Sequence, residues 1–451
     1  MILRRAVLFE LVRGLGLLVV LAALVAAVRV AAPTRDVASS TLLGLGILIF
    51  GGYIAAHLAE NLGLPHLTGY IVAGLLLGPH TLGLVSEDTI QGLRPTNSVA
   101  LALIALTAGA ELSFDLLRRG ARSLGCAIGA HLFVVLPMTF AALLALRGFL
   151  PFLQALPVAG AAAAALLWAV IAMSRSPSST LGVISQLRPS GPLTRHVLSV
   201  VITMDLVVLI SFSIARLIAA LALEPGGGNS SWGALEELGT TLTGSLACGT
   251  TVGLVIALWL KLVKRQLLLF LLLVAYAGTQ LAGYFHFEPL LLFLTAGFVV
   301  SNLTGQGEEL LDLVGAGGQI VFVVFFALAG AHVDLGLVAR VWPIAVTLWV
   351  VRAIATVIGS RAAAALAGDE PTVRRWAGLS MLSQAGTTIT LSTAVGDRFP
   401  ALAGLTAIAV AVAALDELTG PLLFKWSLDR AGETGKEKAP GRAESLDPAE
   451  A

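Results

Sequence analysis

One acidic residue stands alone in a strongly apolar stretch near the middle of the chain. Asp205 lies in SVVITMDLVVLISF, residues 199–212, where no other residue carries a charge. A central aspartate costs about 2.5–3.5 kcal/mol on membrane-insertion scales, so it must face a partner, a cation or water. It could form a fixed salt bridge, or it could bind a proton and a metal ion in turn. Competition between a proton and a cation for one carboxylate is the chemistry of exchange.

Four further charged residues interrupt apolar stretches. Arg352 lies in TLWVVRAIATVIG, Asp416 and Glu417 lie together in AVAALDELTGP, and Arg175 lies in AMSRSPSSTLG. We expect Arg352 to compensate a carboxylate when the site holds no cation, and the two acids are secondary candidates. For these three residues a purely structural ion pair is an equal alternative. Arg175 could compete with a cation for Asp205, or its long side chain could extend to the cytoplasmic surface.

Small polar residues break two of the apolar spans and could supply oxygen ligands. In AMSRSPSSTLG, Pro177 lacks an amide donor and disfavours helix at the residue before it. MLSQAGTTITLS has a similar polar and glycine-containing centre. A proline kink with polar helix contacts is the alternative for either stretch alone. The expected cation and proton ligands are Asp205, Ser176, Ser178, Ser383 and Thr387, with Gln384 as a further candidate.

These residues must be positioned by membrane helices. Of 451 residues, 57% are hydrophobic and 12% are charged, against roughly 25% charged in soluble domains. The predicted fold is an all-α polytopic membrane protein with about fourteen spans. The spans are predicted near 10–31, 39–59, 65–83, 97–115, 123–148, 155–176, 193–221, 236–260, 265–284, 287–303, 317–332, 341–366, 374–396 and 402–427. No basic patch suggests nucleic acid, and no histidine–cysteine spacing suggests a resident metal. We therefore expect neither a cofactor nor an enzyme.

Lysine and arginine in the short loops predict the orientation. If the N-terminus is cytoplasmic, most of these residues fall in inside loops, including Arg118, Arg119, Lys261 and Lys264. This asymmetry predicts a multi-pass protein of the cell inner (cytoplasmic) membrane with both termini in the cytoplasm. The tail RAGETGKEKAPGRAESLDPAEA, from residue 430, is too polar to form a packed core.

The two halves of the chain contain similar helices in the same order. ALIALTAGAELSFDLL resembles VVFFALAGAHVDLGLV, and upstream of each lies GYIVAGLLLGPHTLGLV or LLFLTAGFVVSNLTGQG. An offset of seven spans places the copies in opposite orientations, as in many secondary transporters. The expected units are an N-terminal extra helix (1–38), a first inverted repeat (39–222, core helices 123–222), a linker helix (223–264), a second inverted repeat (265–429, core helices 341–429) and a disordered tail (430–451).

Three stretches resemble a known family. LGLPHLTGYIVAGLLLGPHTLGLV, SSTLGVISQLRPSGPLTRHVLSVVITMDLVVL and DELTGPLLFKWSLDRAGE are similar, in order, to segments of the monovalent cation:proton antiporter-2 family. The resemblance implies a sodium/proton antiporter-like fold with two discontinuous crossing helices, a dimerisation domain and a core that moves as an elevator. It implies a homodimer that exchanges Na⁺ or K⁺ for H⁺ and serves pH homeostasis. The family's ion-binding aspartate falls on Asp205, its basic residue falls on Arg352, and its crossing segments fall on residues 174–178 and 383–386.

The sequence departs from this pattern at two positions. Electrogenic sodium/proton antiporters of this kind have two adjacent acids, but Met204 precedes Asp205 here, so we expect electroneutral exchange. Arg175 occupies a stretch that is usually uncharged. Three alternatives remain open: a potassium efflux system with a separate gating partner, a transport-silent homologue, and an organic-anion transporter that uses Arg175 and Arg352. An intramembrane aspartyl protease with Asp205 and Asp397 is disfavoured, because Asp397 lies at a span end.

Overall fold

The computed structural model describes residues 37–112, 120–223, 230–263, 266–333, 335–384 and 386–434, together with Gly16, Phe114 and Arg118. Every regular element in these ranges is helical. Eight helical segments are long and apolar enough to cross a bilayer: Ser40–Asn61, Ala121–Phe149, Val158–Leu187, Pro192–Leu223, Gly239–Leu262, Leu267–Phe285, Val341–Ala367 and Pro400–Ala431. Three shorter apolar helices are His66–Leu77, Pro289–Thr304 and Ile320–Ala331. The span predicted at 10–31 lies outside the described residues.

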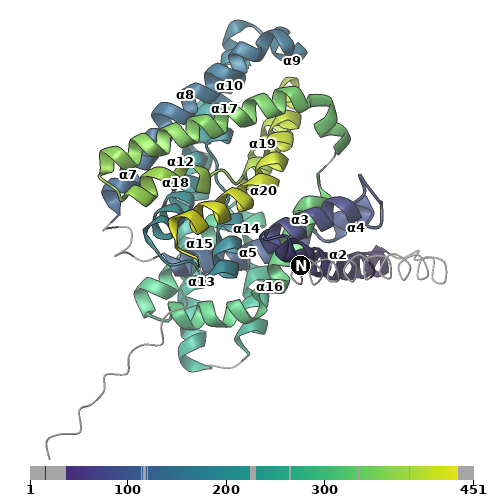
Figure 1. The fold of residues 1–451 in the computed structure, drawn as a ribbon, viewed down its shortest axis with the longest axis vertical. Helices are drawn as coiled ribbons and strands as arrows, with labels where there is room; N and C mark the ends of the chain where they lie inside the picture. The colour runs from purple at the N-terminus through teal and green to yellow at the C-terminus, as the bar shows by residue number, and fades with distance from the viewer. Residues whose placement is uncertain are drawn as a thin grey trace, which may run out of the picture.

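The helices pack into two groups (Figure 1). The scaffold group consists of α2 (Val37–Asn61), α3 (His66–Leu77), α4 (Glu87–Gly92), α5 (Arg94–Glu111), α13 (Ser230–Leu262), α14 (Leu267–Phe285), α15 (Pro289–Thr304) and α16 (Gly307–Ala331). The core group consists of α7 (Ala121–Ala130), α8 (Leu136–Ala145), α10 (Val158–Ala172), α11 (Pro177–Leu187), α12 (Pro192–Leu223), α17 (Leu335–Ala367), α18 (Pro371–Ser380), α19 (Gly386–Arg398) and α20 (Ala403–Ala431). Short turns η1 (His131–Val135), η2 (Leu146–Phe149), α9 (Pro151–Gln154) and η3 (Pro400–Leu402) complete the described elements.

Two predicted spans are interrupted in the structure. A non-helical segment at residues 173–176 separates α10 from α11, and another follows α18 before α19 begins at Gly386. Pro177 is the first residue of α11, where its missing amide donor costs nothing. The Ser176 hydroxyl caps the same helix by accepting a hydrogen bond from the Ser179 amide at 3.1 Å. The sequence signals for a break and for a helix start therefore coincide at one position.

The N-terminus of α12 is closed by a residue from the far end of the chain. The Glu433 carboxylate accepts hydrogen bonds from the amides of Leu193 at 2.7 Å and Thr194 at 2.8 Å. An acidic group at a helix N-terminus satisfies free amides and complements the helix dipole. The predicted tail begins at residue 430, but α20 continues to Ala431 and Glu433 is 1% exposed. Glu433 thus belongs to the folded part, while residues 435–451 lie outside the described ranges.

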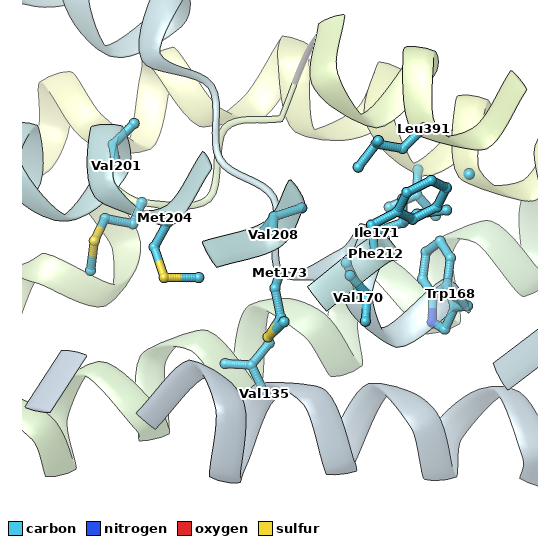
Figure 2. Packing of buried hydrophobic residues seen from close by; sticks show 14 of the residues in the cluster. Val135, Trp168, Val170, Ile171, Met173, Val201, Met204, Val208, Phe212 and Leu391 are labelled. Carbon is cyan, nitrogen blue, oxygen red and sulfur yellow. The ribbon is translucent and has the colours of Figure 1, made fainter. Parts of the chain in front are cut away.

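An apolar cluster fills the core group around α10 and α12. Figure 2 shows Val201, Met204 and Val208 of α12 above Met173 and Val135. Further along α12, Phe212 lies near residues of α10 and α19. At about 100° per residue, Asp205 lies on the same side of α12 as Val201, Val208 and Phe212, so apolar side chains flank it along the helix.

Candidate functional site

Asp205 lies about 13 residues into α12, or roughly 20 Å along its axis at 1.5 Å per residue. Its side chain is 3% exposed. Neither carboxylate oxygen has a hydrogen-bond partner among the described residues. An isolated buried carboxylate is costly unless it is paired or neutralised. Asp205 is therefore a buried acid that no donor in the described ranges satisfies.

The two interrupted helices meet at their non-helical segments. The Ser176 amide donates a hydrogen bond to the Ser383 carbonyl at 3.0 Å. The hydroxyl oxygens of Ser174 and Thr388 are 2.5 Å apart. These contacts join residues more than 200 positions apart in the sequence, so each break supports the other.

Gln384 closes the end of α10. Its side-chain nitrogen lies 3.0 Å from the Ile171 carbonyl oxygen and 3.2 Å from the Ser174 carbonyl oxygen. The last carbonyls of a helix have no partner within the helix, and inside an apolar core they need one. An amide at position 384 therefore stabilises the break in the other half of the chain.

Arg352 lies in α17 and connects both breaks to a buried acid. Its Nε donates to the Ala172 carbonyl at 2.8 Å, and its Nη1 donates to the Leu382 carbonyl at 2.9 Å. The same Nη1 lies 2.9 Å from each Asp416 carboxylate oxygen. The Trp349 indole also donates to Asp416 at 2.9 Å. Arg352 thus neutralises Asp416 within a fully buried ion pair. The same guanidinium group also binds the partially negative C-terminal ends of two helices.

Arg175 contacts α17. Its Nη2 donates to the Thr356 hydroxyl at 3.0 Å and its Nη1 donates to the Ser174 carbonyl at 3.0 Å. The residue is 1% exposed, so its side chain does not extend to the surface. Arg352 also donates to the Ser174 carbonyl, at 3.2 Å, so the two guanidinium groups share one acceptor. The structure therefore places Arg175 with the Arg352–Asp416 pair, and its charge-compensating role stays a prediction.

The other predicted ligands occupy different parts of the crossing. The Ser176 hydroxyl lies 3.1 Å from the Ser178 hydroxyl, at the start of α11. The Ser383 hydroxyl is buried without a partner among the described residues. Thr387 is the second residue of α19 and is partly buried. No hydrogen bond joins any of these to Asp205 within the described ranges. Their role as cation ligands stays a prediction.

Glu417 is buried next to Asp416 but is not part of the same ion pair. It is 2% exposed, and its Oε1 has no hydrogen-bond partner among the described residues. Consecutive residues of a helix point in directions about 100° apart, which explains why only Asp416 reaches Arg352. Glu417 remains a secondary candidate.

Met204 packs among apolar side chains. It is fully buried in the apolar cluster beside Val201 and Val208 (Figure 2). Position 204 is therefore a packing position in this chain.

Four residues of the crossing and its surroundings were not predicted from the sequence: Trp349, Thr356, Thr388 and Glu288. Trp349 precedes Arg352 by three residues, which places both on one helix face. Glu288 lines a cavity together with Leu209, which follows Asp205 by one turn of α12. Its sequence signal is an acid directly before Pro289, at the start of a predicted span.

Comparisons with known proteins agree with this architecture. Solved structures of the sodium proton antiporter MjNhaP1 from Methanocaldococcus jannaschii are similar to it. The structure at pH 8 has a TM-score of 0.63 and 15% sequence identity, and the match covers 88% of this chain and 97% of that one. An electron-microscopy structure of the same antiporter has a TM-score of 0.65 and 16% identity, over 87% of this chain and 98% of that one. These likenesses show a shared fold.

A sequence comparison identifies the family. No curated protein matches the chain. The profile of the transmembrane sodium/hydrogen exchanger family matches residues 44–426, which is most of the sequence. The chain, with its crossing helices and its buried Asp205, therefore belongs to the transmembrane sodium/hydrogen exchanger family.

Proposed function

We propose that the protein is a secondary antiporter that exchanges a monovalent cation, Na⁺ or K⁺, for protons at Asp205. The observation that carries this proposal is the contrast between two buried aspartates. Asp416 is satisfied by Arg352 and Trp349, whereas both oxygens of Asp205 have no partner among the described residues. A carboxylate in that condition gains most from a proton or a cation, which can replace one another.

The cation shell needs oxygen ligands beyond one carboxylate, because hard cations take several. We propose that hydroxyl and carbonyl oxygens near Ser176, Ser178, Ser383 and Thr387 supply them when the core changes conformation. Arg352 would hold the crossing in place and offset the helix-end dipoles in every state. Its contacts to Ala172 and Leu382 support that role.

We propose electroneutral exchange, because Asp205 has no acidic neighbour on its own helix. Met204 is buried among apolar side chains and carries no proton. One carboxylate that trades one proton for one monovalent cation moves no net charge. Cation-driven proton movement in proteoliposomes should then be insensitive to valinomycin. A valinomycin-sensitive rate would require a second titrating group.

The larger architecture is also a proposal. The two helix groups support an elevator motion in which the core carries Asp205 past a stationary scaffold that forms a homodimer. Fourteen spans in inverted repeats, with both termini in the cytoplasm of an inner-membrane protein, would fit the loop charges and the two matched helix breaks.

Asp205→Asn tests the central claim, because it keeps the shape of the side chain and removes the exchangeable charge. Purified protein in proteoliposomes should show a pH change inside on addition of Na⁺, K⁺, Li⁺ or Rb⁺, and Asp205→Asn should abolish it. Asp429→Asn, the same change at the exposed end of α20, is the matched control and should be active. Wild-type activity in Asp205→Asn would falsify the proposal.

The same assay separates the alternatives. A wild type that responds to no cation would favour a transport-silent homologue. Potassium efflux that starts only with an added cytoplasmic partner would favour a gated system. Uptake of an organic anion lost in Arg175→Gln would favour a repurposed transporter.

A further inference from the structure

A cavity of about 190 Å³ lies between the core and scaffold groups, on the C-terminal half of α12. It is lined by Leu209, Phe212, Ser213, Arg216, Thr241, Leu242, His286 and Glu288. This volume has room for several water molecules, each of which takes about 30 Å³ in the liquid. Leu209 follows Asp205 by one helical turn, so the cavity ends close to the buried acid.

Glu288 is the one acidic residue among those that line this cavity. It belongs to the short connection between α14 and α15, and it lines the cavity while remaining partly buried. Asp205 itself has two buried oxygens without a partner. The cavity that Glu288 lines therefore reaches, at Leu209, to within one helical turn of an unsatisfied carboxylate of the core.

The connection that carries Glu288 is held firmly to α13. The Glu288 amide donates to the Ser245 hydroxyl at 2.8 Å, and the Thr241 hydroxyl donates to the His286 carbonyl at 3.2 Å. The Phe287 ring packs directly on Gly244, where a Cβ would overlap it. His286 has φ of 57°, a left-handed conformation that few side chains adopt without support. Glu288 therefore has a fixed place in the scaffold and does not belong to the helices that carry Asp205.

Two other titratable or charged groups line the cavity. Arg216 follows Asp205 by about three turns of α12, roughly 16 Å along the axis, and His286 is exposed. Arg216 has a partner of its own, so its charge does not stand free in the cavity.

We propose that Glu288 is a second, stationary carboxylate of the cation pathway, which draws the cation from this cavity to Asp205. The inference rests on the proposed exchange at Asp205. A cation between the two groups relieves the repulsion of two like charges in a partly dry site. Because Glu288 stays with the scaffold, it acts on Asp205 only in the conformation in which the two groups meet. Glu288 does not move with the core, so it does not change the number of protons that are exchanged for each cation.

Glu288→Gln tests this role, because it removes the charge and nearly keeps the volume. Exchange should persist, with the maximal rate within about twofold of wild type and a half-maximal cation concentration roughly three- to thirtyfold higher. Glu288→Asp keeps the charge on a shorter side chain and should give a smaller rise. Glu87→Gln, at an exposed glutamate in α4, is the matched control and should behave as wild type.

The possible outcomes distinguish this inference from the proposed function. An unchanged half-maximal concentration in Glu288→Gln, with Asp205→Asn inactive, would overturn the role of Glu288 and leave the exchange at Asp205 standing. A lower maximal rate with unchanged half-saturation in both Glu288 variants would make the residue a structural cap of α15, and would also overturn it. An active Asp205→Asn, or a wild type without exchange, would remove the basis of both proposals. If Glu288→Gln is too unstable to reconstitute, the half-maximal cation concentration of Glu288→Asp provides the test: a value above that of wild type supports the role of Glu288, and an unchanged value overturns it.

Discussion

At the scale of single residues, the buried charges fall into two environments. Arg352 and Asp416 satisfy each other and several backbone carbonyls, so they act as structural groups of the crossing. Asp205 has no such partner in the described ranges, and the proposed function makes it the acid that exchanges a proton for a cation. The distinction depends on which atoms are satisfied, since all three residues are equally buried.

Arg352→Lys should weaken the crossing although it keeps the charge. A guanidinium presents five donors in a planar fork, and a lysine ammonium cannot reach Ala172, Leu382 and Asp416 together. We expect a loss of about 2–4 kcal/mol of stability, read as a lower unfolding temperature in detergent. Arg374→Lys, at an exposed position of α18, is the control. Equal unfolding temperatures for both variants would contradict the structural role of Arg352.

The pH dependence of exchange should follow competition between one proton and one cation at Asp205. Where Asp205 holds a proton in the absence of cation, each unit of rising pH should lower the half-maximal cation concentration about tenfold, because one proton leaves for each cation bound. Where Asp205 is already ionised, the concentration should level off. Flux measured at one-unit pH steps gives the slope. A slope near two would mean that a second group releases a proton, and repeating the series with Glu288→Gln would show whether Glu288 is that group.

Met204→Asp should not create a second transporting acid. The side chain would lie among Val201, Val208 and the rest of the apolar cluster, where a new unpaired carboxyl group costs several kcal/mol. We expect a lower unfolding temperature and no valinomycin-sensitive charge movement. Met204→Leu, a change of similar volume, should cost less than about 1.5 kcal/mol. Stable, charge-moving exchange in Met204→Asp would show that position 204 can reach the ion.

The sequence predicts single buried charges better than their partners. Asp205 and Arg352 are recognisable because a charge in an apolar span is rare, whatever surrounds it. Whether such a charge is paired depends on helices far apart in the chain, so the Arg352–Asp416 pair was only one of several possibilities. Glu288 was missed because an acid before a proline at the start of a span looks like an ordinary helix start.

At the scale of elements, the two breaks depend on close helix contacts. Gly420 in α20 packs against the crossing, and a Cβ at this position would lie 2.6 Å from the Ser383 Cα. Within a helix, glycine is roughly 1 kcal/mol less favourable than alanine, so Gly420 makes α20 less stable than alanine would in an open position. The close approach of the Ser383 backbone explains why a residue without a Cβ stands here.

Gly420→Ala should therefore destabilise the protein and slow exchange, although replacing glycine by alanine within a helix usually stabilises a protein. The matched control is Gly125→Ala in α7, where a Cβ meets no atom within 4 Å and alanine should be neutral or stabilising. Unfolding temperature and maximal exchange rate measure both effects. If the two variants change stability in the same direction, then α20 tolerates the added methyl group and the crossing is not held by this contact.

The sequence predicts the ends of helices where local residues, such as proline and capping serines, determine them. Pro177 and the serines around it predict the first break, because they both disfavour the helix before them and cap the helix after them. The span predicted at 317–332 is shorter than α16, which begins at Gly307. Its first turns are polar and glycine-rich, and such residues form helix only when neighbouring elements support them. The π-helical turn at His131–Val135 leaves no pattern that sequence periodicity could detect.

At the scale of the whole molecule, the scaffold contains two helix pairs with matching contacts. In the α3–α16 pair, a Cβ at Gly74 would overlap the Ala327 carbonyl, and one at Gly330 would overlap the Ile71 carbonyl. In the α15–α5 pair, Gly297 meets the Leu106 carbonyl and Gly109 meets the Leu294 carbonyl in the same way. In each pair, the carbonyl that a glycine meets lies three residues before the partner helix's own glycine. The sequence repeat relates α3 to α15 and α5 to α16, so these contacts support the proposed inverted symmetry.

If the two pairs are symmetry equivalents, substitution at equivalent glycines should have equal consequences. Gly74→Ala and Gly297→Ala each place a methyl group against a carbonyl of the facing helix, which forces the two backbones apart. We expect each variant to lower the unfolding temperature by a similar amount, and the double variant to lower it by about the sum, since separate sites usually add. Gly46→Ala, on an open face of α2, is the control. A large fall in unfolding temperature at one glycine and none at its equivalent would contradict the symmetry, because the two backbones approach each other equally closely at symmetry-related contacts.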